Sequence, residues 1–158
     1  MTVDLTVRFI DTSVLCNLVD VPGRNQDREA VQAEFKALVE GRTTHFVIPV
    51  TTIIETGNHI ANAVGDRRTA AERLQRFVDQ AARDEAPWQL HAITWDARFL
   101  AELRSGAGTG MPLVDHLGNG TMGTGDLAIL GERNAFRMRT SFRSVEIWTL
   151  EHTLAAYS

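Results

Sequence analysis

The sequence predicts an α/β fold in which a parallel sheet is covered by helices on both faces. Short apolar segments that favour strands alternate with amphipathic segments that favour helices along the whole chain. The chain has 158 residues, of which 44% are hydrophobic and 23% are charged, a composition typical of a soluble globular protein of one domain. We therefore expect residues 1–158 to form one domain that binds ligands at the carboxyl ends of its strands.

Charge, hydropathy and cysteine content exclude several classes of protein. The net charge of −4 argues against a protein that holds nucleic acid by bulk positive charge. No apolar run approaches the roughly 18 residues that span a bilayer, and the start, MTVDLTVRF, lacks the basic and apolar regions of a signal peptide. We expect a cytoplasmic protein with no membrane partner. Cys16, the single cysteine, lies in an apolar segment and is expected to be a buried thiol.

The first strand and the first helix meet at an acid. Val7–Ile10 is a short apolar run typical of a buried strand, and it stops at Asp11. Thr12 and Ser13 then lead into the apolar segment Val14–Val19, which we expect to be helical. Asp11 is therefore either the N-cap of this helix or a ligand-binding acid at a strand-to-helix turn.

A second strand and helix repeat this arrangement. The apolar spacing over Asp27–Glu40 predicts a helix, and Gly41 follows it as a stop. His45–Val50 is a short apolar run suited to a buried strand. Glu55 lies in the segment TTIIETGNHI, just past the carboxyl end of that strand.

Glu55 has two interpretations. With Thr51 or Thr52 as the helix cap, Thr52 and Glu55 have the spacing of a capping box, in which the glutamate is solvated. Alternatively, Glu55 repeats the position of Asp11 and serves the same site. His59 follows Glu55 by four residues and could share its helix face, but such a pair is more often a surface feature than a metal site.

The middle of the chain continues the alternation. Asp66–Asp84 has the apolar stripe of an amphipathic helix, and Trp88–Trp95 is interpreted as a third strand in which His91 is structural. Asp96–Leu103 predicts a short helix. Asp96 is either another acid at a strand end or the cap of this helix, and we interpret it as the cap.

A glycine-rich segment, Gly106–Gly125, holds seven glycines and is expected to form a loop or several turns. Within it, GNGTMG at Gly118–Gly123 matches the pattern G-x-G-x-x-G, and a helix and a strand follow, as in a dinucleotide-binding unit. Two observations oppose that interpretation. The preceding MPLVDHL makes a poor buried strand, and the carboxylate of Asp126 would repel a pyrophosphate.

The last helix and strand add two further acids. Asp126 opens a helix expected over Asp126–Arg137, and a strand expected over Val145–Leu150 delivers Glu151 at its end. A basic cluster lies close in sequence to both acids, although such clusters are usually solvated. It comprises Arg133, Arg137, Arg139 and Arg143.

Asp11, Glu55, Asp126 and Glu151 would all lie near one edge of a parallel sheet, and their recurrence favours a shared site over four separate helix caps. Two carboxylates about 4 Å apart repel by roughly 4 kcal/mol at an effective dielectric of about 20, so such a cluster needs cations or takes up protons. Oxygen ligands without cysteine select hard ions such as Mg²⁺ or Mn²⁺. The chemistry most often built on such a site is phosphodiester hydrolysis by metal-activated water.

Four segments carry a family resemblance in their order along the chain. They are IDTSVL at Ile10–Leu15, PVTTIIETGN at Pro49–Asn58, GDLAIL at Gly125–Leu130 and WTLEHTL at Trp148–Leu154. Together they resemble the acid-bearing motifs of PIN-domain ribonucleases, particularly the VapC-like toxins of bacterial toxin–antitoxin pairs. The acid of the last motif is commonly aspartate in that family and is Glu151 in this chain.

The resemblance implies a three-layer α/β/α sandwich around a small, mainly parallel sheet, and Mg²⁺- or Mn²⁺-dependent endonucleolytic cleavage of RNA. Asp11, Glu55 and Asp126 would hold the metal and its attacking water, with Glu151 as a weaker fourth ligand.

The same resemblance implies supporting residues and partners. Thr12 and Thr149 would steady the carboxylates by hydrogen bonding, and Arg133 and Arg137 would contact RNA phosphates. The protein would dimerise with itself and be inhibited by a small antitoxin protein whose tail enters the acidic site. Two other hypotheses stay open: a non-catalytic PIN-like module that binds RNA or a protein, and a nucleotide-cofactor protein that uses the glycine-rich segment.

Overall fold

The structure is a computed structural model and describes residues 4–158. Strands and helices alternate at both ends of the chain, whereas the middle is helical. In chain order the elements are β1 (Thr6–Ile10), α1 (Thr12–Val19), α2 (Arg28–Gly41), β2 (Thr44–Val47), α3 (Val50–Asn62), α4 (Arg67–Ala81), α5 (Ala97–Arg104), α6 (Leu113–Asn119), α7 (Thr124–Arg139), β3 (Ser144–Trp148) and α8 (His152–Ala155).

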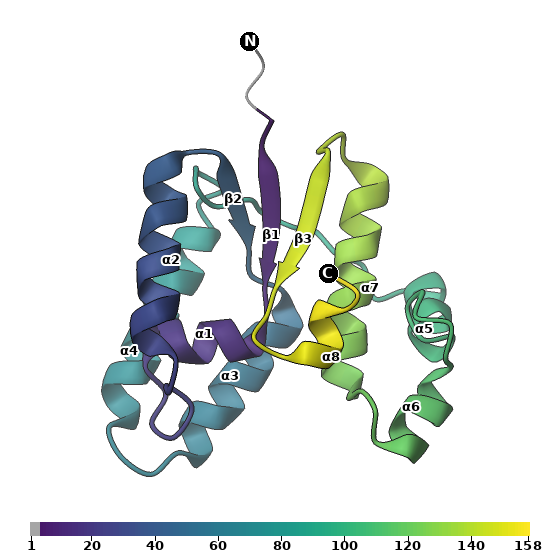
Figure 1. Ribbon diagram of the computed structural model, residues 1–158, viewed down its shortest axis with the longest axis horizontal. Helices are drawn as coiled ribbons and strands as arrows, with labels where there is room; N and C mark the ends of the chain where they lie inside the picture. The colour runs from purple at the N-terminus through teal and green to yellow at the C-terminus, as the bar shows by residue number, and fades with distance from the viewer. Residues whose placement is uncertain (1–3) are drawn as a thin grey trace.

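The three strands form one parallel sheet in the order β2-β1-β3. In the central strand β1, Thr6 pairs with Thr44 of β2 on one side and with Ser144 of β3 on the other. All three strands point the same way, as Figure 1 shows. The segments that follow the strands therefore leave the sheet at one common edge, where parallel α/β folds bind ligands.

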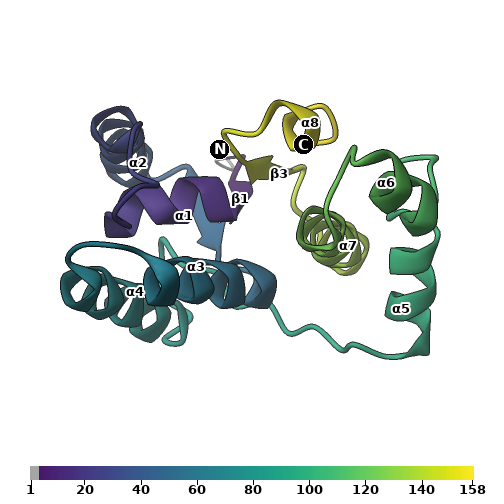
Figure 2. The same ribbon diagram turned by 90° about the horizontal axis from the view of Figure 1, so that it is seen from below.

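Helices cover both faces of the sheet, which confirms the predicted α/β sandwich. Figure 2 shows α1, α2 and α4 to one side of the strands, and α7, with α5 and α6 beyond it, to the other. The helix α3 lies below the carboxyl edge of the sheet and contacts α1, α4 and α7. Its position makes α3 a bridge between the two helical layers at the edge where a site is expected.

Each face of the sheet has its own hydrophobic core. Ile10 of β1 and Trp148 of β3 belong to the core shared with α1, whereas Phe9 and Ile147, their predecessors in the two strands, belong to the core shared with α7. Successive strand residues point to opposite faces, so both faces of β1 are buried. This explains why β1 ends in two consecutive apolar residues, Phe9 and Ile10, whereas Arg8 before them is partly exposed and pairs with Glu34.

The expected strand at Trp88–Trp95 is wrong. The segment forms only an isolated bridge between Trp88 and Phe46, and the rest of it follows an irregular path. Its apolar side chains serve other contacts: Trp88 packs against Phe35 and Phe46, and Trp95 packs against Phe99. Tertiary packing of aromatic rings, and not a hydrogen-bonded ladder, accounts for the hydrophobicity of this segment.

The glycine-rich segment contains a helix that the sequence did not predict. Pro112 is the N-cap of α6 and Gly120, with φ of 64°, is its C-cap. The buried His116 of α6 lies 2.8 Å from Thr109 Oγ1 through Nε2 and 2.9 Å from Thr121 Oγ1 through Nδ1. These contacts tie both flanking loops to the helix.

Among the helices of residues 4–158, none combines the length and the apolarity that crossing a membrane requires.

Candidate active site

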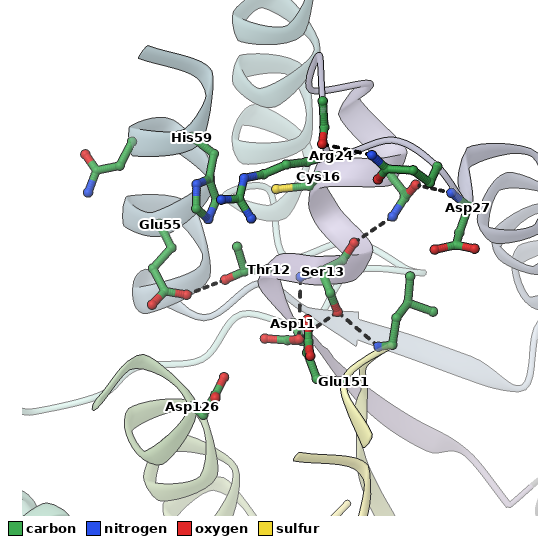
Figure 3. Close-up of a pocket in the computed structure, with 15 residues that line it drawn as sticks. Asp11, Thr12, Ser13, Cys16, Arg24, Asp27, Glu55, His59, Asp126 and Glu151 are labelled. Atoms are coloured by element: carbon green, nitrogen blue, oxygen red, sulfur yellow. Dashed lines mark hydrogen bonds between the residues drawn. The ribbon is translucent and has the colours of Figure 1, made fainter. Parts of the chain in front are cut away.

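The four carboxylates singled out in the sequence line one cavity of about 530 Å³ at the carboxyl edge of the sheet. They are Asp11, Glu55, Asp126 and Glu151. Figure 3 shows the carboxylates of Asp11, Glu55 and Asp126 around one space, with Glu151 beside Asp11. The convergence expected from the parallel sheet is present, although the four residues come from segments far apart in the chain.

Asp11 acts as a helix cap and as a wall of the cavity. Its side chain is only 1% exposed, and its Oδ2 accepts hydrogen bonds from Ser13 Oγ at 2.8 Å and from Thr149 Oγ1 at 2.7 Å. Ser13 N is a more distant donor at 3.4 Å. Among the described residues, Oδ1 has no hydrogen-bond partner although it is buried. An unpaired buried carboxylate oxygen is unfavourable unless a proton or a cation meets it.

Glu55 is held by a hydroxyl on the neighbouring helix. Thr12 Oγ1 donates to Glu55 Oε2 at 2.6 Å, which links α3 to α1. The capping-box interpretation is wrong, because α3 begins at Val50 with Pro49 as its N-cap. Thr52 lies inside the helix and donates instead to the carbonyl of Ile10 at 2.8 Å. That buried hydrogen bond fixes α3 to the end of β1 and so places Glu55 near Asp11.

Asp126 lies in the first turn of α7, whose N-cap is Gly123. Burial and the negative charges of Asp11 and Glu55 together raise the pKa of Asp126 to about 6, against the opposing effect of a hydrogen bond from the backbone of Gly123. The position at a helix N-terminus favours a negative charge. The raised pKa shows that burial and the other carboxylates outweigh this effect.

Glu151 is the most exposed of the four acids. β3 ends at Trp148, two residues earlier than expected, and Glu151 lies at the N-cap of α8 without accepting a capping hydrogen bond. Its backbone N–H donates to Thr149 Oγ1 at 3.0 Å. The hydroxyl of Thr149 therefore connects the backbone of Glu151 with the carboxylate of Asp11.

The hydrogen bonds expected from Thr12 and Thr149 to the carboxylates are both present. The sequence did not single out Ser13 as a site residue, yet Ser13 Oγ donates to Asp11 and accepts from the backbone of Leu150 at 3.0 Å. Its position two residues after a capping acid was the available signal, because hydroxyl side chains at that position satisfy such an acid.

Arg24 and His59 also line the cavity. His59 shares a helix face with Glu55, as its spacing allowed. Burial lowers the pKa of His59, the charge of Arg24 lowers it further, and that of Glu55 opposes them. No local pattern marks Arg24, which follows the turn at Gly23 and reaches the cavity only through the tertiary fold. Cys16 is buried as expected, and burial raises the pKa of its thiol to about 11.

The structure does not place Arg133 or Arg137 at this cavity. Arg133 is 5% exposed, and its guanidinium donates to the carbonyl of Tyr157 at 2.6 Å and to that of Val145 at 3.4 Å. Arg137 donates to the same Val145 carbonyl at 3.1 Å. Arg133 is thus buried by contacts with β3 and the end of the chain, whereas Arg137 is exposed and makes one such contact. Their contact with RNA phosphates stays a prediction.

The glycine pattern lies between two helices. Gly118 is inside α6, Gly120 caps its end, and Gly123 caps the start of α7. The elements directly before the pattern are the helices α5 and α6 and not a strand, so the dinucleotide interpretation lacks its first element. Two residues of this segment, Thr121 and Gly123, line a second cavity together with Asp126 and Glu151.

The donor chemistry of the first cavity fits a hard divalent cation. Asp11 offers a buried oxygen without a partner, and Glu55, Asp126 and Glu151 add only carboxylate oxygens, which Mg²⁺ and Mn²⁺ prefer. In the part of the chain that the structure describes, no group of three or more such side chains is arranged as a coordination sphere. A bound ion would therefore draw the carboxylates closer together.

Comparisons with known proteins identify no family. No protein-family model matches the sequence. The search of curated proteins and the search of solved structures give no match either.

Proposed function

We propose that this protein is a metal-dependent endoribonuclease that cleaves RNA phosphodiester bonds, with a PIN-like fold and the role of a VapC-like toxin. The observation that carries the proposal is the meeting of Asp11, Glu55, Asp126 and Glu151 in one cavity, with Asp11 Oδ1 buried and without a partner. The resemblance of the four acid-bearing segments to that family supports the choice of reaction. The three-layer fold agrees with it.

Asp11, Glu55 and Asp126 would hold Mg²⁺ or Mn²⁺, and Glu151 would reach the same region from α8. When bound, the metal supplies a water activated for attack and a positive charge for the leaving oxygen. Thr12 orients Glu55, as Thr149 orients Asp11, by the hydrogen bonds described above. Such supporting hydrogen bonds to metal ligands commonly change metal affinity 10- to 100-fold, roughly, when removed.

The acidic cavity also suggests how the protein is controlled. An arginine from a small antitoxin would replace the charge of the metal by binding a carboxylate through two parallel hydrogen bonds. Self-association into a homodimer and a cytoplasmic location belong to the same proposal, because they follow from the family resemblance.

Thermal unfolding with and without Mn²⁺ or Mg²⁺ tests the metal site. A ligand that binds only the folded state, at 100 times its dissociation constant, adds about 2.7 kcal/mol. We expect a metal-dependent rise in the unfolding midpoint that Asp126→Asn removes. Asp115→Asn is the matched control, since Asp115 is an exposed acid in the first turn of α6.

Two outcomes would contradict the proposal. A midpoint that does not respond to either metal, together with a more stable Asp126→Asn variant, would favour a non-catalytic module whose acidic cavity takes a cationic partner. A metal response that is equal in Asp126→Asn and Asp115→Asn would place the metal elsewhere.

A further inference from the structure

Arg24 stands out among the cavity residues because of its charge. Of the described residues that line the cavity, it is the only arginine or lysine. It follows the turn after α1, where its backbone N–H donates to the carbonyl of Val21 at 2.9 Å. Gly23, with φ of 81°, precedes it and allows the chain to turn back toward the cavity.

The exposed guanidinium of Arg24 makes no hydrogen bond or ion pair with a cavity residue within residues 4–158. Figure 3 draws no hydrogen bond from Arg24 to the other residues of the cavity, although Asp27 and the four acids described above line the same space. Nearby arginines behave differently, because Arg28 and Arg73 both pair with Asp20, at 3.8 and 3.2 Å. Thr12 and Thr149 hold two of the cavity carboxylates by their own hydrogen bonds. Arg24 therefore keeps its donors for a ligand.

His59 and Asn58 complete a group of donors around Arg24. Figure 3 shows the imidazole of His59 beside the Arg24 guanidinium, while Asp126 and Glu151 lie across the cavity. Burial and the charge of Arg24 lower the pKa of His59, whereas the charge of Glu55 opposes this shift. A ring N–H of the imidazole can donate a hydrogen bond to a ligand, and the exposed Asn58, whose amide is also a donor, lines the same cavity.

We infer that Arg24, with His59 and Asn58, forms a subsite for an RNA phosphate that neighbours the phosphodiester held at the four carboxylates. A guanidinium binds phosphate through two parallel hydrogen bonds, which an ammonium group cannot reproduce. The positive charge of Arg24 also offsets part of the repulsion that a polyanion meets in a cavity lined by acids. The inference rests on the proposed function and adds the direction of the strand, from the carboxylates toward the turn after α1.

The test measures RNA binding as a function of salt. The probe is a pool of fluorescein-labelled single-stranded RNA ten-mers, and every protein carries Asp126→Asn so that the RNA stays intact. Each phosphate contact to a single strand contributes about 0.7 to the slope of log affinity against log salt. Arg24→Gln should weaken binding about tenfold and reduce this slope by about 0.7. His59→Gln should weaken binding and change the slope less than Arg24→Gln does, because the permanent charge of Arg24 is retained in it.

Arg104→Gln is the matched control, since Arg104 is an exposed arginine at the end of α5. It should leave affinity and slope unchanged. The Mn²⁺-dependent rise of the unfolding midpoint, measured in the chain without Asp126→Asn, should survive Arg24→Gln.

The failures are distinguishable. An unchanged slope in Arg24→Gln, in a protein that binds Mn²⁺ and cleaves RNA, overturns the subsite and leaves the proposed function standing. Absence of RNA binding in the parent protein overturns both. Tighter binding of a polyglutamate peptide than of RNA, lost in Arg24→Gln, would assign Arg24 to an acidic protein segment and overturn the RNA subsite.

Discussion

Gly125 of α7 lies against the carboxylate of Glu55 in α3, and a Cβ at position 125 would overlap with Glu55 Oε1. The backbone of α7, which carries Asp126, thus packs directly against the carboxylate of Glu55 in α3. Because Gly125 has no side chain, the start of α7 can approach Glu55 closely. This brings Asp126, the next residue, to the same cavity as Glu55.

Gly125→Ala is expected to displace the Glu55 carboxylate and weaken Mn²⁺ binding about tenfold, as is usual when the support of a metal ligand changes. Folding should not suffer, because alanine favours a helix over glycine by about 1 kcal/mol. Gly57→Ala in α3 is the control, since no atom lies within 4 Å of a Cβ there. Calorimetric titration with Mn²⁺ checks this, and equal affinities in the two variants would contradict it.

Asp11→Asn and Asp126→Asn are each expected to abolish RNA cleavage while the fold remains intact. Asp126→Asn should also stabilise the metal-free protein above pH 6, because the raised pKa of Asp126 means that its ionised form is unfavourable in the folded state. Gel assays of cleavage and denaturant unfolding measure the two effects. Full activity in either variant would rule out the assigned roles.

Thr12→Val should lower metal affinity roughly 10- to 100-fold by removing the hydrogen bond of 2.6 Å to Glu55. Thr12→Ser retains the hydroxyl and should behave like the parent protein. Mn²⁺ titration of both variants separates loss of the hydrogen bond from loss of packing. If serine fails to restore affinity, the hydroxyl of Thr12 does not orient Glu55.

Glu132 is expected to make stability depend on pH. It is fully buried in α7, and neither carboxylate oxygen has a partner with hydrogen-bond geometry among the described residues. Burial outweighs the opposing effect of the nearby Val50 backbone and raises the pKa of Glu132 to about 7. Between about pH 4.5 and 7 the unfolded chain ionises Glu132 while the folded chain keeps it protonated. The free energy of unfolding should therefore fall as pH rises through this window, by at most about 3 kcal/mol.

Glu132→Gln should remove this contribution, so the variant gains stability over the parent protein at pH 8 and little at pH 4. Denaturant unfolding across this range measures it, with Glu85→Gln as the exposed control. Parallel pH profiles for the parent protein and Glu132→Gln would show that Glu132 does not titrate in this window.

Arg133→Gln should destabilise the protein by about 2–3 kcal/mol, because its hydrogen bonds to the carbonyls of Tyr157 and Val145 are largely buried. Arg137 is exposed, and Arg137→Gln removes a single hydrogen bond to the carbonyl of Val145. It should cost about 1 kcal/mol or less. Urea unfolding distinguishes the two. RNA cleavage per folded molecule should be unchanged in both, and a selective loss of RNA affinity would restore them as phosphate contacts.

Sequence patterns predicted the parts of this fold that local chemistry determines. Asp11 is an N-cap after a buried strand, and Asp126 lies at the start of a helix, as their sequence neighbours indicated. The parallel arrangement then explains why acids after different strands share one cavity. Glu151 was expected at a strand end and lies three residues beyond it, because β3 stops at Trp148.

The errors come from contacts between distant segments. The apolar run from Trp88 resembles a strand, but its rings pack against other elements. Arg133 looks like a surface cation until Tyr157 covers it. Arg24 enters the cavity through the turn of the chain, so its neighbours in sequence give no sign of its place.

The central strand β1 is made early, yet its partner β3 lies near the opposite end of the described chain. Asp11 gains the hydrogen bond from Thr149 only after β3 has paired, and Glu151 follows β3. The cavity therefore depends on the pairing of β3 with β1, because this pairing positions both Thr149 and Glu151 beside Asp11.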